Sequence, residues 1–283
     1  MPKDKKPKPP APSLAERADK YVCYQKSVQE PTHEVEFFDQ AFRDAFGRKA
    51  THLREDFCGT FAVCCEWVKS KKNRTAVGVD LDPEPLTWGK ENNLARLTDA
   101  QQQRVHLVEQ DARRRNRLPG EPAEILAAQN FSFWLFKTRA ELLKYFRAAR
   151  ANLADEGLMV MDMMGGGECY EEEHEDVRTI AKGKKGFKYI WTQESFNPVT
   201  HDARFTITFK FKDGSRLEPA FEYDWRFWTI PEVRELLAEA GFAETRVYWE
   251  VVTDDGEETG DWHRVDDAPS DPSWVCYIVA IKK

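Results

Sequence analysis

The sequence lacks a hydrophobic run long enough to cross a membrane. Its longest uninterrupted apolar stretch, Trp274 to Ile281, has eight residues, whereas a membrane-spanning helix needs about 20. The amino-terminal residues also lack the apolar stretch of a secretory signal. These absences predict a cytoplasmic protein that has no membrane partner.

Cysteine pairs and common metal-ligand motifs are absent as well. The six cysteines include no CxxC pair and the six histidines include no HExxH, so neither a disulfide framework nor a zinc site is indicated. The acidic run 171–176, with His174 inside it, could be imagined as a metal site, but a block of like charges repels itself and is typical of a solvated loop. We therefore expect reduced thiols and no metal.

Positive charge is scarce outside the first twelve residues. The chain carries 42 Lys and Arg against 49 Asp and Glu, and removing residues 1–12, which hold four lysines, one aspartate and five prolines, takes the net charge from −7 to −10. Nucleic-acid binders usually present a basic face that releases counterions from phosphate. A nucleic-acid partner is therefore not expected, and residues 1–12 are predicted to be a disordered, basic, proline-rich tail.

Two helical patterns follow this tail. Ser13 and Glu16 have the spacing of a capping box, which predicts that a helix begins there. Apolar residues then recur near a 3.6-residue period over 35–46 and stop at Gly47, a suitable left-handed cap. We interpret residues 13–50 as an N-terminal helical lid. Its first helix would carry Tyr21, Tyr24 and Gln25.

From residue 51, short strand-like segments alternate with helical patterns. Strands are predicted at 75–80, 105–111, 123–129 and 157–164, and helices at 60–69 and 84–94. A third helix is predicted with its apolar face at 142–153 and its end at Gly157. Alternation of this kind is typical of a parallel sheet with helices on both faces. The first strand, 51–57, is unusually polar for such a sheet, and pairing of Arg54 with a nearby acid is one explanation.

Between residues 187 and 228 the alternation of strands and helices stops, and 12 of the chain's 35 aromatic residues fall there. Apolar and polar residues alternate over 205–211, and Asp213-Gly214 marks a hairpin turn. The pattern predicts an inserted antiparallel unit. A helix at 230–240 and strands at 243–252 and 274–281 complete a domain predicted to span 51–283.

The segment 53–60 carries the strongest chemical signal. Its Gly59 precedes a predicted helix, and Asp80 closes the next predicted strand some twenty residues later. A glycine in such a turn lets the backbone approach a ligand, and the acid can hold both hydroxyls of a ribose. One glycine and one acid are a weak signal by themselves.

Residues 55–61 resemble the first motif of the class I S-adenosylmethionine-dependent methyltransferases, D-x-G-C-G-T-G. Glu55 takes the place of the acid, residues 58–60 match directly, and Phe57 and Phe61 replace the first and last glycines. The stretches 226–232 and 240–242 resemble the R-x-[FY]-[ST]-x-x-E and A-G-F stretches of small-molecule members. The resemblance covers about residues 20 to 283. Either the loop path differs or cofactor binding has been lost, and we expect the former.

The resemblance implies a Rossmann-like α/β fold with a mostly parallel seven-stranded sheet, S-adenosylmethionine as cofactor, and in-line methyl transfer to a small-molecule acceptor. The cofactor-binding residues it implies are Tyr21, Glu55, Cys58, Gly59, Thr60, Asp80, Leu81, Asp111, Ala112, Asn130 and Phe131. The expected catalytic residues are Asn130 and Tyr24, and the expected acceptor contacts are Tyr24, Gln25, His201, Arg226 and Trp228.

Structural interpretations compete with these roles. Glu55 and Asp56 could cap the following helix, Asp80 could be a charge at a helix start, and Arg226 could belong to a salt bridge. The tyrosines of the first helix could anchor it, and the aromatic side chains of the insert could be core. Against these readings, four of the polar residues follow successive predicted strands, at the edge where open α/β sheets bind ligands. They are Glu55, Asp80, Asp111 and Asn130.

Other functions stay open at this point. A protein or RNA methyltransferase could use the lysine-rich leader to recruit a polymer, and a catalytically silent relative could keep the fold as a scaffold. A nicotinamide dehydrogenase is disfavoured because G-x-G-x-x-G is absent after the first strand. The oligomeric state is also open, with a homodimer as one candidate.

Overall fold

A computed structural model describes residues 11–115, 122–181, 183, 186–252 and 258–283. Most of the predicted tail, residues 1–10, therefore lies outside the described residues. The chain divides into two compact units. The smaller comprises Met1–Gln29, Glu172–Ser195 and Arg204–Tyr223, and the larger comprises Glu30–Glu171, Phe196–Ala203 and Asp224–Lys283.

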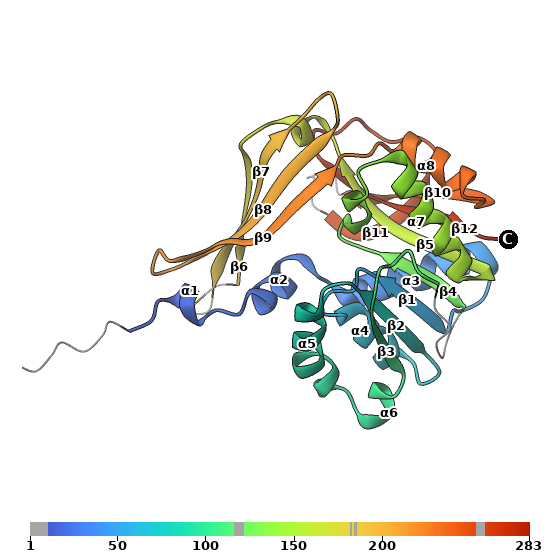
Figure 1. The fold of residues 1–283 in the computed structure, drawn as a ribbon, viewed down its shortest axis with the longest axis horizontal. Helices are drawn as coiled ribbons and strands as arrows, with labels where there is room; N and C mark the ends of the chain where they lie inside the picture. The colour runs from blue at the N-terminus through green and yellow to red at the C-terminus, as the bar shows by residue number, and fades with distance from the viewer. Residues whose placement is uncertain (1–10, 116–121, 182, 184–185, 253–257) are drawn as a thin grey trace, which may run out of the picture. The chain divides into compact units, whose positions relative to one another are not determined.

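The larger unit contains an eight-stranded sheet in the order β11-β10-β12-β5-β4-β1-β2-β3 (Figure 1). The strands are β1 His52–Asp56, β2 Thr75–Asp80, β3 Val105–Glu109, β4 Ala123–Ala128, β5 Leu153–Gly165, β10 Glu244–Val252, β11 Glu258–Val265 and β12 Trp274–Ile281. Strands β1 to β5 pair in parallel, and β12, β10 and β11 are antiparallel. The predicted count of seven strands is wrong because β11 forms between the two strands predicted at 243–252 and 274–281.

Helices cover both faces of this sheet, as the alternation predicted. They are α3 Pro31–Phe46, α4 Ala62–Ser70, α5 Pro83–Asn92, α6 Asp99–Gln102, α7 Arg139–Asn152 and α8 Ile230–Glu239, with short 3₁₀ turns at Leu94–Arg96, Ser132–Leu135 and Gly167–Tyr170. Helix α7 ends earlier than predicted because Leu153 is already extended and begins β5. Among the described residues, no helix has the length and apolar character needed to span a membrane.

One hydrophobic core lies between the sheet and helices α3 and α4. Leu53, Ala127, Val160 and Val279 project from four neighbouring strands into one buried cluster with side chains of these helices. Because successive side chains of a strand point to opposite faces, the intervening residues face α7 on the other side. Tyr145 of α7 accordingly reaches Asp56 rather than Glu55.

The smaller unit contains most of a four-stranded sheet in the order β6-β7-β8-β9, whose strand ends at Phe196, 202–203 and 224–226 belong to the larger unit. Its strands are β6 His174–Ile180, β7 Phe187–Phe196, β8 Asp202–Phe211 and β9 Arg216–Arg226. The turn at Asp213-Gly214 is confirmed, since Gly214 has a φ of +85° and Phe211 N–H bonds to Ser215 O. The prediction placed the start of the insert too late, because β6 includes part of the acidic run that was interpreted as a loop. Its exposed Glu175 and Asp176 stay in solvent.

The amino-terminal helical segment differs from the prediction in one respect. Ser13 and Glu16 do form a capping box, but α1 is only Leu14–Arg17. Asp19 then accepts the N–H groups of Tyr21 and Val22 and caps a second helix, α2 Lys20–Val28. Helices α1 and α2 belong to the smaller unit, whereas α3 belongs to the larger one. That residues 13–50 act as a lid stays a prediction.

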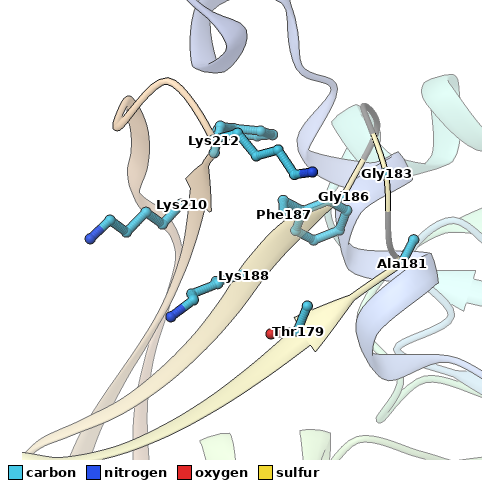
Figure 2. A pocket seen from close by; sticks show the side chains of 9 residues that line it. Thr179, Ala181, Gly183, Gly186, Phe187, Lys188, Lys210 and Lys212 are labelled. Atoms are coloured by element: carbon cyan, nitrogen blue, oxygen red, sulfur yellow. The ribbon is translucent and has the colours of Figure 1, made fainter.

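A cavity of about 300 Å³ opens on the smaller unit, where the end of β6 and the start of β7 meet the end of β8 (Figure 2). Phe187 and Phe211 line it together with three lysines. Figure 2 shows Lys188 and Lys210 extending away from Phe187, whereas Lys212 bends toward it. None of the residues predicted to bind cofactor or acceptor lines this cavity.

Candidate functional site

The loop between β1 and α4 has an unusual backbone. Phe57, Gly59 and Phe61 all have positive φ, at 58°, 51° and 46°. Non-glycine residues seldom adopt this left-handed conformation, which costs about 1 kcal/mol or more per residue. Phe57 and Phe61 are the two positions at which the resembling motif has glycine, so both phenylalanines hold a conformation that glycine favours.

The two rings leave this loop in different directions. The Phe61 ring is fully buried in the core. It packs directly on the backbone of α5 at Gly89. The contact is so close that a Cβ added at Gly89 would lie 2.5 Å from the Cε1 of Phe61. The half-buried Phe57 ring packs against Tyr145 and Phe136, at centroid distances of 5.4 and 6.0 Å. Phe61 thus extends the core under α5.

Asp80 connects this loop to the end of β2. Its Oδ2 accepts the Gly59 N–H at 2.7 Å and its Oδ1 accepts the Asp82 N–H at 2.9 Å. Partial burial raises the pKa of the Asp80 carboxyl. A carboxylate can accept about four hydrogen bonds, so the group keeps capacity for a ligand hydroxyl beside its backbone partners. The position therefore suits an acid that recognises a diol.

Glu55 caps the helix that follows it, which was one of the competing structural interpretations. It is buried, and its Oε2 accepts the N–H of Cys64 in the first turn of α4 at 3.1 Å, so it caps that helix. Burial is the main cause that raises the pKa of Glu55 to about 7. Asp56, one residue later, faces the opposite side of the sheet.

Asp56 and Arg54 account for the polar character of β1. Arg54 is fully buried, and its Nε donates to Asp56 Oδ1 at 2.7 Å. The Tyr145 hydroxyl donates to the other carboxylate oxygen at 3.2 Å. A buried ion pair of this kind is stable only when its remaining polar atoms are also hydrogen-bonded. The polar first strand is therefore a structural network, as the predicted pairing of Arg54 with an acid implied.

Asp111 lies just beyond β3, which ends at Glu109 rather than at the predicted residue 111. The N–H of Gln110 donates to Asp80 O at 2.8 Å, so Asp111 follows directly beside the end of β2. The Arg113 guanidinium donates to both carboxylate oxygens of Asp111, at 2.9 and 2.6 Å. This pairing lowers the pKa of Asp111. Ala112, next in the chain, is buried.

Asn130 and Phe131 follow β4, and both have a φ of 56°. Their N–H groups donate to the two carboxylate oxygens of Asp162 on β5, at 2.8 and 2.9 Å. Burial raises the pKa of Asp162 to about 6. Sequence reasoning missed Asp162, although a single acid inside the apolar run 157–164 is a signal of a buried functional or structural carboxyl.

Three further predicted residues lie in the loop between β1 and α4 or directly after β2. Leu81 is 68% exposed and points away from the core, whereas Thr60 is buried. The Cys58 thiol is buried against Gly78, where an added Cβ would lie 3.0 Å from its sulfur. Burial and neighbouring carboxyls raise the pKa of Cys58 well above its usual value, which disfavours the reactive thiolate.

The expected acceptor contacts in the larger unit have structural partners. Arg226 donates to Glu232 at 3.2 Å, and its guanidinium lies 3.9 Å from the centre of the Trp228 ring. Trp228 is buried, and its Nε1 donates to Phe136 O at 3.2 Å. The His201 ring contacts Phe196 at 5.5 Å. These contacts favour the salt-bridge and core interpretations, and an acceptor role for the three residues stays a prediction.

The remaining predicted residues lie on α2. The rings of Tyr21 and Tyr24 contact Phe221 at 5.9 and 5.0 Å. Both tyrosines thus anchor α2 on β9 within the smaller unit, which was the competing structural interpretation. Roles for Tyr21, Tyr24 and Gln25 toward cofactor or acceptor stay predictions.

Comparisons with protein-family models and with curated proteins returned no match. Among solved structures, the chain is similar to CalS10, an amino pentose methyltransferase from Micromonospora echinaspora, with a TM-score of 0.64 and 16% identity over 93% of this chain and 96% of that one. It is similar to DesVI from Streptomyces venezuelae, with a TM-score of 0.65 and 14% identity over 96% and 100%. For the sugar N-methyltransferase KedS8 from a Streptoalloteichus species, the TM-score is 0.62 at 14% identity over 100% and 99%. The chain therefore has the Rossmann-like α/β fold of S-adenosylmethionine-dependent methyltransferases.

Proposed function

We propose that this protein is an S-adenosylmethionine-dependent methyltransferase that acts on a small-molecule acceptor by in-line methyl transfer. The observation that carries the proposal is the loop after β1. Its two phenylalanines keep left-handed backbone where the motif has glycine, and its Gly59 N–H is tied to the acid that closes β2. The altered motif thus retains the backbone path that a close ligand requires.

The residues present fit such a cofactor. Asp80 and Asp111 offer carboxylate oxygens at neighbouring strand ends, and the loop 58–60 supplies backbone close to Asp80. The cofactor would supply an electrophilic methyl group on a sulfonium, so no covalent protein nucleophile is needed. The protein's contribution is to position the acceptor and exclude water, and Asn130 and Phe131 are held for that purpose by Asp162.

Two observations support a small-molecule acceptor. Structures similar to this chain include an amino pentose methyltransferase and a sugar N-methyltransferase. Within the larger unit, the Trp225 ring packs on the rings of Phe131 and Trp134, at centroid distances of 6.3 and 6.1 Å. The segment after β4 is therefore lined by aromatic side chains. A protein or RNA methyltransferase is the alternative, and deletion of residues 1–12 separates the two, because a small-molecule enzyme keeps its activity without this leader.

Calorimetric titration with S-adenosylmethionine tests the proposal. We expect a dissociation constant in the micromolar range. We also expect ligand at about one hundred times this constant to stabilise the native state by about 2.7 kcal/mol, which a thermal shift records. If millimolar ligand produces neither heat nor a thermal shift, the protein is a silent scaffold and the proposal fails.

The proposed cellular compartment is the cytoplasm. All six cysteines are free and buried, which supports the reducing, cytoplasmic compartment inferred from the sequence. The homodimer and the lack of a nucleic-acid partner stay predictions.

A further inference from the structure

Polar side chains replace apolar ones toward the carboxyl ends of β1, β4 and β5, and beside them on the antiparallel strand β12, on the face that α3 covers. Tyr277 of β12 pairs in register with Asp162 of β5. Ala128 pairs with Met161, so Gln129 continues β4 beside Asp162. By the alternation of strand side chains, these residues continue the buried rows of this face. The rows run from Leu53 to Glu55, from Ala127 to Gln129, from Val160 to Asp162 and from Val279 to Tyr277.

Helix α3 adds Glu34 to this group. Glu34 lies one helical turn before Phe37, whose ring stacks on Tyr277 at 4.0 Å. It is only 8% exposed, although it is a glutamate on the apolar face of an amphipathic helix. The ionisable groups that face it are Glu55 of β1, Asp162 of β5, Tyr277 of β12 and Glu30 at the start of α3. Burial, reinforced by the three carboxyls, raises the pKa of Glu34 to about 8.

Two polar atoms in this group have no hydrogen-bond partner among the described residues. They are the buried Oε2 of Glu34 and the buried Nε2 of Gln129, whose side chain is 5% exposed. Buried polar groups are almost always hydrogen-bonded, so such exceptions indicate a missing partner. The carboxyl oxygen of Glu34 needs a hydrogen-bond donor or a cation, and the amide N–H of Gln129 needs an acceptor. A ligand that carries both a cation and an acceptor would satisfy both atoms.

We propose that Glu34 and Gln129 bind the amino-acid end of S-adenosylmethionine, with the ammonium at Glu34 and the carboxylate at Gln129. The proposal rests on the proposed function and assigns residues for the methionyl part of the cofactor. An ammonium also balances the negative charge that Glu55 and Asp162 contribute. Glu55 lies three residues before the loop cysteine Cys58 and close enough to raise its pKa, so the group adjoins the loop that approaches the ligand.

The same geometry couples binding to a proton. Burial raises the pKa of Glu34 to about 8, so its carboxyl is mostly protonated in the free protein at pH 7. An ammonium stabilises the carboxylate, so binding sends the carboxyl proton to the buffer. Affinity for a ligand with an amino-acid end should therefore rise between pH 6 and 8, and it should fall at higher pH where the ligand ammonium itself loses its proton.

The test compares S-adenosylhomocysteine with 5′-methylthioadenosine, a nucleoside that lacks the amino-acid end. We expect Glu34→Gln to weaken S-adenosylhomocysteine binding by about tenfold to one-hundredfold, the usual effect of losing a charge-assisted hydrogen bond. Binding of 5′-methylthioadenosine should change by less than about twofold. Titration at pH 7 in two buffers of different ionisation enthalpy should show proton release by the wild type with S-adenosylhomocysteine and much less by the variant.

Glu36→Gln is the matched control, because it makes the same change two residues later on α3 at an exposed residue. It should leave the affinity for both ligands unchanged. Gln129→Met is a second variant that removes the orphaned donor and should weaken S-adenosylhomocysteine alone. Equal losses for both ligands, or no loss for either, would overturn the assignment. A wild type that binds neither ligand would instead overturn the proposed function.

Discussion

Replacing Asp80 with alanine should lower the affinity for S-adenosylhomocysteine by about one-hundredfold or more, the largest effect that we expect on ligand binding. Loss of a hydrogen bond to a charged group typically costs about 1.5–3 kcal/mol. Asp80 would contribute more than one such bond, since its carboxylate also holds the Gly59 and Asp82 N–H groups that shape the site. Isothermal titration of wild type and variant measures the change.

Asp82 offers a matched control for this experiment. It is exposed, and its side chain caps α5 by accepting the Glu84 N–H at 2.9 Å. Asp82→Ser removes the same charge two residues away and keeps a capping oxygen, so affinity should change by less than about threefold if only a screened surface charge is lost. Similar losses in Asp80→Ala and Asp82→Ser would mean that charge alone matters and that Asp80 does not contact the ligand.

Replacing Phe61 should give the largest change in stability. Removing this fully buried ring in Phe61→Ala should lower the free energy of unfolding by about 3–5 kcal/mol. The glycine variant should be more stable than the alanine variant by about 1 kcal/mol, because glycine tolerates the φ of 46° and also suits the N-cap of α4. Urea unfolding of both variants measures the two values.

Phe38 is the control for this order of stability, in which the glycine variant is more stable than the alanine variant. It is also fully buried, but it lies in the interior of α3. There glycine should be less stable than alanine by about 0.5–1 kcal/mol, the ordinary cost of glycine in a helix. If the two sites show the same order of stability, Phe61 does not hold left-handed backbone, and the argument for a glycine-like loop loses its basis.

The parts of the fold that depend on local pattern were predictable from the sequence. The parallel strands follow from apolar segments alternating with helical ones, and the end of α3 at Gly47 follows from a left-handed cap with a φ of 68°. The break between α1 and α2 was missed because Asp19 lies inside a continuous helical pattern and acts as a second cap. Strands β6 and β11 were missed because they are polar edge strands, which pair through their backbones and carry little apolar periodicity.

The candidate site was predictable only where it coincides with strand ends. Glu55, Asp80 and Asn130 could be placed because an acid or amide that follows a strand lies at the ligand-binding edge. The partners of these residues depend on register and helix packing, which the sequence does not specify. Glu34 illustrates this limit, since it looked like one charged residue on a helix until α3 placed it against Tyr277 and Asp162.

A crystal structure grown with S-adenosylhomocysteine tests the central claim most directly. The account predicts electron density for the nucleoside at the carboxyl ends of β1, β2 and β4. The ribose hydroxyls should lie within hydrogen-bonding distance of Asp80, and the amino-acid end should lie beside Glu34 and Gln129. Density for the nucleoside elsewhere, such as in the cavity lined by Phe187 and Phe211, or no density at saturating ligand, would contradict it.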